Sequence, residues 1–417
     1  MLKHPLVSSV FLLSSLLFAS AAVAGEWPGW RGPRGDGHSD EPNIPTRWSA
    51  TENVHWKVAV PGRGHSSPVI YGDRIFLTSA LEKEQTRVLL CLDRRTGKTL
   101  WQKAVVKSPL EQKHDLNSYA SATPVTDGKH LWVSFFEQPR IVVACFDLDG
   151  NEVWRVSPGT FSSIHGFCSS PVLYGDTVIL NGDQDADAYV VAFDKATGKE
   201  RWRTDRPNKT RSYCTPLFIE HGGRKQMVLS GSKSVCSYDP DTGKPIWWMS
   251  GPTEQFVASL VYDNAVLFVT AGFPDLHILG VDPGGSGDVT ATHIKWRDHR
   301  GAAYVPSPVA HRGHFFLVSD NGIATCFEAS TGKKPWKERL GRRHSASAVV
   351  AGDNAYFLDD DGTTWVVKAA PEYHLVSENV LGEAAFASPA ISRGQIFIRT
   401  VGHLWCIGKP AEGQARR

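Results

Sequence analysis

Short hydrophobic runs separated by turn-forming residues recur along most of this chain. One run leads into the stretch 93–98, Asp-Arg-Arg-Thr-Gly-Lys, and Trp101 follows shortly afterwards. An Asp side chain can accept hydrogen bonds from the backbone amides just ahead of it, and Gly tolerates a positive φ, so this stretch predicts a tight turn. The pattern therefore predicts a β-hairpin whose second strand carries a large aromatic side chain.

The turn and its tryptophan are repeated at intervals through the sequence. Further copies of the turn begin at Asp147, Asp194, Asp239, Asp282 and Glu328. After Trp101 the tryptophans follow at Trp154, Trp202, Trp247, Trp296 and Trp336, at intervals of 53, 48, 45, 49 and 40 residues. A repeat of this length is typical of propeller blades that have four strands each.

A second phrase precedes each hairpin. It consists of a small polar residue, then in most copies a proline, and then a short hydrophobic strand. It begins at Ser67, Thr123, Ser170, Thr215, Ser259, Ser307, Ser347 and Ser388. Proline at the first position of a strand costs no ladder hydrogen bond. Counting these phrases predicts eight blades.

The two ends of the repeated region each carry what the other lacks. Residues 54–58 and Trp56 resemble the end of a repeat, but no Ser-Pro phrase precedes them. The last repeat has the phrase at Ser388 but no tryptophan after Cys406. We therefore predict an all-β, eight-bladed propeller of four-stranded antiparallel blades over residues 54–408, closed by the N-terminal strand as the outermost strand of the last blade. The seventh repeat lacks both the turn and the tryptophan, so we expect it to be the least firmly tied.

The segments outside the repeats suggest export. Residues 1–24 combine Lys3 and His4 with an apolar run and an Ala22-Val23-Ala24 end, which predicts a signal peptide. An uncleaved anchor is the alternative. We expect a periplasmic or secreted protein without a lipid anchor, because no Cys follows the cleavage position, and no other stretch is apolar enough to span a membrane.

Residues 25–53 are rich in Trp, Gly and Pro, and we expect them to pack on the body of the propeller. The alternative is a plug or lid over one mouth of its channel. We expect residues 409–417 to form a C-terminal tail after the propeller.

Composition adds two constraints. Lys and Arg number 45 against 43 Asp and Glu, so charge gives no argument for a nucleic-acid partner. Of the seven Cys, four occupy one repeat position that Ala192 fills elsewhere, which indicates a small packing site. Cys168 and Cys214 precede equivalent strands of consecutive repeats and are the pair we expect to form a disulfide if one exists. Cys236 has no assignment.

The repeated Asp, Thr-Gly-Lys and Trp positions resemble the tryptophan-docking motif of the pyrroloquinoline-quinone (PQQ) repeat superfamily, whose members have eight four-stranded blades around an axis. The resemblance covers almost the whole chain after residue 53. It implies that one tryptophan from each of seven repeats packs between neighbouring blades. These are Trp56, Trp101, Trp154, Trp202, Trp247, Trp296 and Trp336.

Two branches of this superfamily differ in function. The quinoprotein dehydrogenases oxidise alcohols or sugars with PQQ and calcium, and their alcohol dehydrogenases carry two adjacent Cys, which this chain lacks. The other branch consists of propellers similar to the B subunit of the outer-membrane barrel assembly machinery. These are scaffolds without a cofactor, and this chain resembles them in size. We expect a monomeric binding or scaffolding module for a protein or small ligand, without assigned catalysis. A PQQ-dependent alcohol or sugar dehydrogenase is the alternative.

The connections that lead into the innermost strands of a propeller gather around its axis on one face. Aromatic, His and Arg side chains occupy these positions and are the candidate ligand contacts, although packing against the next blade is an equally good explanation. They are His65, Tyr119, His165, Arg211, Tyr213, Phe256, Tyr304, His344 and Phe386.

One further stretch resembles a calcium loop. Asp183, Asp185 and Asp187 have the spacing of its first ligands, but Ala188 stands where such a loop requires Gly. A solvated hairpin loop is the preferred interpretation, and these three residues remain a weak calcium candidate.

Overall fold

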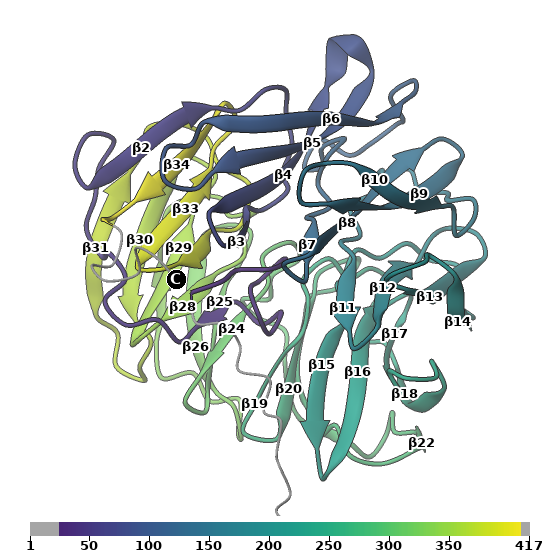
Figure 1. The fold of residues 1–417 in the computed structure, drawn as a ribbon. Helices are drawn as coiled ribbons and strands as arrows, with labels where there is room; N and C mark the ends of the chain where they lie inside the picture. Colours follow the sequence, from purple (N-terminus) through teal and green to yellow (C-terminus); the bar gives the residue numbers. More distant parts are fainter. Residues whose placement is uncertain (1–24, 410–417) are drawn as a thin grey trace, which may run out of the picture.

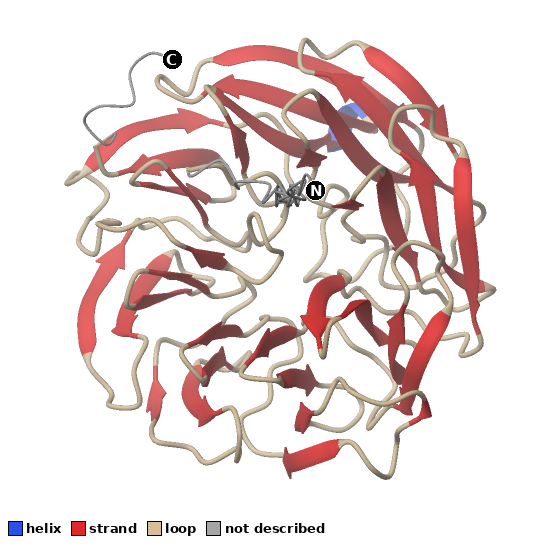
Figure 2. Cartoon of the chain, turned by 60° about the horizontal axis from the view of Figure 1, so that its bottom comes forward, coloured by secondary structure: helices blue, strands red, loops and turns tan. Residues whose placement is uncertain are grey.

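The computed structural model describes residues 25–409 and arranges them as eight antiparallel sheets around a central axis (Figure 1, Figure 2). Within these residues the only helix is a short 3-10 turn, η1 (Glu82–Glu84). The prediction of an all-β, eight-bladed propeller is confirmed. The predicted signal peptide and most of the predicted C-terminal tail lie outside the described residues.

The first four blades follow one another along the chain from the innermost to the outermost strand. Their strands are β3 (Val69–Tyr71), β4 (Arg74–Leu81), β5 (Thr86–Asp93) and β6 (Thr99–Lys107); β7 (Val125–Thr126), β8 (His130–Glu137), β9 (Arg140–Asp147) and β10 (Glu152–Val156); β11 (Val172–Tyr174), β12 (Thr177–Gly182), β13 (Ala188–Asp194) and β14 (Glu200–Arg206); and β15 (Leu217–His221), β16 (Arg224–Gly231), β17 (Ser234–Tyr238) and β18 (Pro245–Ser250).

The remaining four blades complete the ring. Their strands are β19 (Val261–Asp263), β20 (Val266–Ala271), β21 (His277–Val281) and β23 (Ile294–Asp298); β24 (Val309–His311), β25 (His314–Val318), β26 (Ile323–Glu328) and β27 (Lys337–Arg339); β28 (Val349–Ala351), β29 (Asn354–Leu358), β30 (Thr363–Lys368) and β31 (Leu375–Val380); and β32 (Ala390–Ser392), β33 (Gln395–Arg399), β34 (His403–Ile407) and β2 (Val54–Ala59). Two short strands extend blades 7 and 4: β1 (His38–Ser39) pairs with β28, and β22 (Gly287–Asp288) pairs with β18.

The N-terminal strand closes the ring as predicted. In β2, Trp56 stands opposite Cys406 and Val58 opposite Leu404 of the antiparallel neighbour β34. This pairing makes β2 the outermost strand of blade 8, so the first and last parts of the repeated region share one sheet. Closure removes the sheet edges that an open array would expose.

Each repeat turn is built around its acidic residue. The Oδ1 atom of Asp93 accepts hydrogen bonds from the Thr96 amide and hydroxyl, both at 2.8 Å. Gly97 adopts a φ of 71°, and a Cβ atom there would lie 2.8 Å from the Trp56 ring of the preceding blade. Glycine is therefore required both by the backbone conformation and by the indole that lies against the turn.

The indole N–H groups join neighbouring blades through the same turns. Trp56, Trp101, Trp154, Trp247, Trp296 and Trp336 donate to the carbonyl oxygens of Arg94, Leu148, Lys195, Pro283, Ala329 and Ala370, respectively, at 2.8–3.0 Å. The Nε1 atom of Trp202 has no partner among the described residues, although its ring packs on Gly243.

The Asp194 turn predicts a measurable acid sensitivity. Hydrogen bonds from Arg201 and then Thr197 lower the pKa of the Asp194 carboxyl to about 2. Because its pKa is depressed on folding, this group stabilises the fold above its unfolded pKa of about 4, and the contribution is lost as the pH falls towards 2. We expect Asp194→Asn to be less stable than wild type at pH 7, with a difference that shrinks between pH 5 and pH 3 in urea denaturation. A difference that does not change with pH would contradict this.

A belt of hydroxyl groups surrounds the axis where the innermost strands begin. The amides of Ser67, Thr123, Thr215, Ser259, Ser307 and Ser347 donate to the hydroxyls of Thr123, Ser170, Ser259, Ser307, Ser347 and Ser388, respectively, at 2.9–3.0 Å. The repeated small polar residue of the sequence phrase thus satisfies a backbone donor of the preceding blade.

The segment before β2 contacts the inner strands of several blades. Trp27, which is buried, exchanges two 2.9 Å backbone hydrogen bonds with Ile70 of blade 1. The carbonyl oxygen of Pro28 accepts from the Thr126 amide of blade 2.

The same segment then reaches the opposite side of the ring. The buried Arg31 side chain donates to the Pro308 carbonyl of blade 6, and the Val350 amide of blade 7 donates to Gly37. Residues 27–39 therefore contact the inner strands of blades 1, 2 and 7 and the chain at the start of the inner strand of blade 6.

Blade 7 differs from our expectation of a weakly tied blade. Ser377 of β31 stands opposite Val366, at the position that holds the docking tryptophan in other blades. Trp48 of the N-terminal segment is buried there, 6.5 Å from the Tyr356 ring, and its amide donates to Asn379. In four other blades the docking indole lies 5.8–6.1 Å from the aromatic ring at the position of Tyr356. Trp48 thus supplies the missing indole from outside the repeat.

All seven cysteines are free in the structure, so the disulfide suggested for Cys168 and Cys214 is not formed. The Cys214 thiol instead donates to the Ala258 carbonyl at 3.1 Å. The repeat position of Cys91 and its equivalents is buried, as expected of a small packing site.

Candidate functional site

A pocket of about 180 Å³ lies on the propeller axis. Five of the residues predicted for the axial face line it. They are His65, His165, Tyr213, Tyr304 and Phe386. These side chains come from blade-entry connections far apart in the sequence, and the ring geometry brings them together.

The pocket is bounded by the hydroxyl belt and by the N-terminal segment. Ser67, Ser170 and Ser307 of the belt line it, together with Trp30. Trp30 also lines a second, larger cavity beside the N-terminal segment and the inner strands of blades 2 to 4. Trp30 therefore lies between the axial pocket and this larger cavity.

Two imidazoles form one wall of the pocket. The rings of His114 and His165 meet edge to face with centroids 5.1 Å apart. His165 Nδ1 accepts from Arg211 Nε at 3.2 Å, which leaves Nε2 as its donor nitrogen. Burial, then Arg211 and His114, lower the pKa of His165. The His165 ring is therefore uncharged at neutral pH and offers its Nε2–H group as a donor.

His65 also lines the pocket, and its backbone amide donates to the Ser118 hydroxyl at 3.0 Å. Burial, followed by the charges of Arg399 and Lys113, lowers the pKa of His65 to about 4. Its ring packs against Phe386 with centroids 4.9 Å apart. The rim thus combines neutral imidazoles with aromatic rings, which suits an uncharged or amphipathic contact.

Four predicted residues do not line the pocket. Phe256 is completely buried in the core between blades, and Tyr119 packs beneath the Arg87 and Lys113 side chains. Arg211 lies behind His165 and forms an ion pair with Asp185 at 2.9 Å.

His344 is also buried, at 2% exposure. Its two ring nitrogens lie 3.1 Å from the Leu358 carbonyl oxygen and 2.6 Å from the Leu340 carbonyl oxygen, so it ties neighbouring segments together. For Phe256 and His344, the packing explanation left open from the sequence describes the observed contacts.

The sequence reasoning missed the residues of an insertion between blades 1 and 2. His114, Leu116 and Asn117 line the pocket but lie outside the repeated phrases. The loop is held by a buried ion pair between Arg87 of β5 and Glu111. A signal for it existed in the extra length between Trp101 and Thr123, which exceeds that of the other repeats.

The three carboxylates of the weak calcium candidate are each engaged by a separate basic side chain. Asp183 pairs with Arg206 at 2.7 Å, and Asp187 pairs with Lys209 at 2.7 Å. Asp185 holds Arg211 as described above. Across residues 25–409, no group of three or more His, Cys, Asp or Glu side chains is arranged to hold a metal ion.

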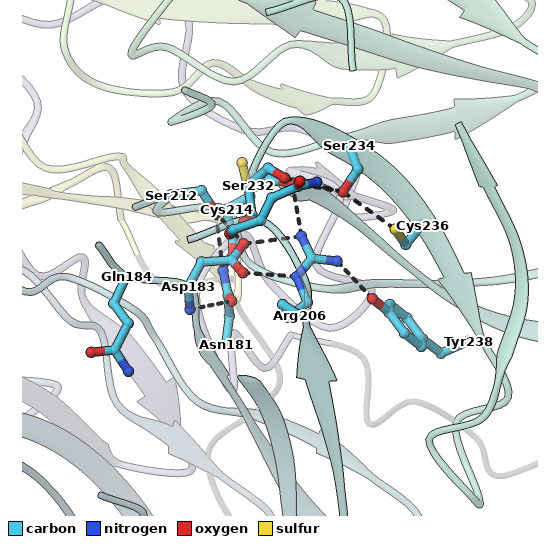
Figure 3. A network of polar contacts seen from close by, with 12 residues as sticks. Asn181, Asp183, Gln184, Arg206, Ser212, Cys214, Ser232, Ser234, Cys236 and Tyr238 are labelled. Atoms are coloured by element: carbon cyan, nitrogen blue, oxygen red, sulfur yellow. Dashed lines mark hydrogen bonds and ion pairs between the residues drawn. The ribbon is translucent and has the colours of Figure 1, made fainter. Parts of the chain in front are cut away.

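The Asp183 pair is the centre of a buried network between blades 3 and 4 (Figure 3). Arg206 also donates to the Tyr238 hydroxyl at 2.6 Å and to the Gly231 carbonyl at 2.8 Å. Ser212 donates to the second carboxylate oxygen of Asp183 at 2.6 Å. Almost every donor of the guanidinium is satisfied, so the network is a structural connection between blades.

The axial pocket does not fit PQQ with calcium. Calcium takes six to eight oxygen ligands, for which carboxylates are the usual side-chain source. The residues that line the pocket include no Asp or Glu, and they include no Lys or Arg. The donor set is made of hydroxyls, imidazoles and one amide, so we derive no chemistry through this cofactor.

No helix in residues 25–409 is long and apolar enough to cross a membrane.

Sequence comparisons identify relatives over most of the propeller. A family model described as "Outer membrane protein assembly factor BamB" matches residues 46–135, 84–253, 186–303 and 280–371. A protein of that description from Nitrosomonas eutropha is 27% identical over 55% of this chain, and the match spans about half (53%) of that protein. One from Burkholderia pseudomallei is 21% identical over 81% of this chain and 82% of its own length.

Solved structures share the fold at low sequence identity. BamB from Moraxella catarrhalis is 13% identical, covers 87% of this chain and 99% of its own, and has a TM-score of 0.61. A quinohemoprotein alcohol dehydrogenase from Comamonas testosteroni is also 13% identical, covers 96% and 83%, and has a TM-score of 0.66. Fold similarity thus includes both branches, whereas the sequence match favours one. The chain belongs to the PQQ-like repeat family whose model is described as outer membrane protein assembly factor BamB.

Proposed function

We propose that this protein is an exported, non-enzymatic scaffold that binds a protein partner during outer-membrane protein assembly. The family match carries the proposal, because both curated relatives are described as outer membrane protein assembly factors. The absence of carboxylate and basic side chains from the axial pocket lining further favours a scaffold over a calcium-quinone oxidoreductase.

The axial face is the proposed partner-binding surface. Tyr213, Tyr304, Phe386 and the imidazoles around them combine apolar rings with hydrogen-bonding groups, and such residues dominate the energetics of protein interfaces. Leu116 adds an exposed apolar side chain to the rim, at 48% exposure. The rigid ring would hold these groups in fixed positions, which lowers the entropic cost of binding.

Site-specific photocrosslinking in the cell envelope tests this proposal. A photoreactive phenylalanine analogue at Leu116 should form adducts with proteins of the outer-membrane assembly machinery. Val153, which is equally exposed on the outermost strand β10, is the matched control and should give none. In the same assay Tyr304→Ala should reduce the adduct yield about tenfold or more, as expected for an interface anchor.

The competing function has its own readout. Purified protein mixed with PQQ and calcium should show neither saturable binding nor dye-linked oxidation of alcohols or sugars. Stoichiometric binding with turnover would overturn the proposal in favour of the dehydrogenase. Equal crosslinking from positions 116 and 153 would contradict the axial face as the binding surface.

A further inference from the structure

A third cavity, of about 180 Å³, lies beside the axial pocket, where blade 8 meets blade 1. It shares His65, Asn117 and Phe386 with the axial pocket. Its charged lining residues are Arg63, Glu82, Lys113, Asp115 and Arg399.

Arg399 is the buried member of this set, at 2% exposure. Its Nη1 atom donates to the Ser66 carbonyl and hydroxyl and to the Thr78 carbonyl, at 2.7–3.2 Å. Its Nη2 atom has one long contact, 3.4 Å to the Ser79 hydroxyl, and within residues 25–409 its Nε atom has no acceptor. One half of the guanidinium is thus used to join the blades, and the Nε–Nη2 edge is left open.

A glycine lies next to Nη2 of Arg399. Gly64 lines the cavity, and a Cβ atom there would lie only 2.8 Å from Arg399 Nη2. A larger residue at position 64 would cover the open edge of the guanidinium.

The three cationic side chains of the cavity form no ion pair within residues 25–409. No carboxylate of residues 25–409 lies within 4.0 Å of a cationic nitrogen of Arg63, Lys113 or Arg399. Burial alone lowers the pKa of Arg399 to about 9, which reflects the cost of a buried charge without a counter-ion. An anion placed against Arg399 would offset that cost.

The other charges indicate which anion fits. Three cationic and two anionic side chains line the cavity, which leaves one uncompensated positive charge. Glu82 and Asp115 would repel a doubly charged phosphate or sulfate. The Nε–Nη2 edge of a guanidinium presents two parallel N–H groups that match the two oxygens of a carboxylate.

We propose that the cavity between blades 8 and 1 is a binding site for a carboxylate monoanion, whose two oxygens accept hydrogen bonds from the Nε–H and Nη2–H groups of Arg399. Either a small organic acid or the free carboxylate of a polypeptide has this chemistry. The proposal is independent of the function proposed above, because it concerns only the charges and donors of this cavity.

The test uses acetate as the probe, at constant ionic strength against chloride. Acetate should raise the melting temperature in a saturable manner. It should also raise the pKa of His65, followed by NMR, because an anion beside Arg399 favours the imidazolium. Arg399→Gln should abolish both effects. Since this change also removes a connection between blades, Arg63→Gln at an exposed position and Lys113→Gln at a half-buried one provide the second measurement. Each should weaken acetate binding about two- to fivefold.

Two further variants serve as controls. Glu82→Gln should strengthen acetate binding by a similar factor, and Arg339→Gln, exposed on blade 6, should leave it unchanged.

A pentapeptide with a free C-terminus, compared with its amidated form, distinguishes the two sources of the carboxylate. Tighter binding of the free form than of acetate indicates a polypeptide, and acetate binding alone indicates a small acid. Equal effects of acetate and chloride, tighter binding of phosphate, or indifference to all four charge variants would overturn the proposal.

Discussion

Replacing Trp48 with alanine should lower the free energy of unfolding by about 3–5 kcal/mol, the usual cost of truncating a buried Trp to Ala. The residue lies outside the repeats, yet it is 5% exposed and stacks on Tyr356 of blade 7. Its indole N–H has no partner among the described residues, so burial and packing account for its contribution. Trp48→Phe should therefore retain much of the stability. Urea denaturation of the three proteins measures the effect.

Two further variants make this prediction specific. Trp248 on strand β18 is 45% exposed. Trp248→Ala should therefore change the free energy of unfolding by less than about 0.5 kcal/mol. Ser377→Trp should recover part of the loss in the Trp48→Ala protein, because position 377 holds the docking indole in other blades. Equal losses for Trp48→Ala and Trp248→Ala would contradict the assignment of Trp48 as the anchor of blade 7.

Asp183→Asn should also destabilise the protein by about 3–5 kcal/mol, because it leaves the Arg206 charge buried without its partner. The two side chains are 0% and 1% exposed, and their N–O distance is 2.7 Å. Replacing both by apolar residues, as in Asp183→Leu with Arg206→Met, should cost less than the sum of the single changes, since neither charge is then left unpaired. Chemical denaturation of this double-mutant cycle gives the coupling energy.

Asp187 provides the matched control from the same loop. Its ion pair with Lys209 is exposed, so Asp187→Asn should have little measurable effect on unfolding. A loss for Asp187→Asn as large as that for Asp183→Asn would show that the loop, and not the buried pair, determines stability.

The fold could be predicted from the sequence because each blade repeats the same local chemistry. The Asp turn, the glycine against an indole and the small polar residue at the inner strand each have one physical role that recurs. Even the closure by residues 54–59 followed from what the two ends lacked. What the repeat could not reveal was Trp48, because its partner, the gap over Ser377, is created only when the chain has folded.

The candidate site could be predicted only in part. Equivalent positions in a repeat identify the connection that reaches the axis, but not the direction in which its side chain points. Phe256 turns into the core and His344 lies between two carbonyl groups, whereas Tyr304 lines the pocket. His114 was missed because it belongs to an insertion that the repeat does not describe. Trp30 was missed as a lining residue because its segment has no counterpart in other repeats.

The pairing of β2 with β34 also sets the order in which the protein can be completed. Residues 54–59 leave the ribosome long before residues 403–407, and β34 is the strand with which β2 pairs in its sheet, whereas β34 also pairs with β33. Strand β2 must therefore remain without its partner strand until nearly the whole polypeptide has been made. Such a long wait for a distant partner is a slow, aggregation-exposed step, and helper proteins that shield nascent chains would be expected to act on this strand.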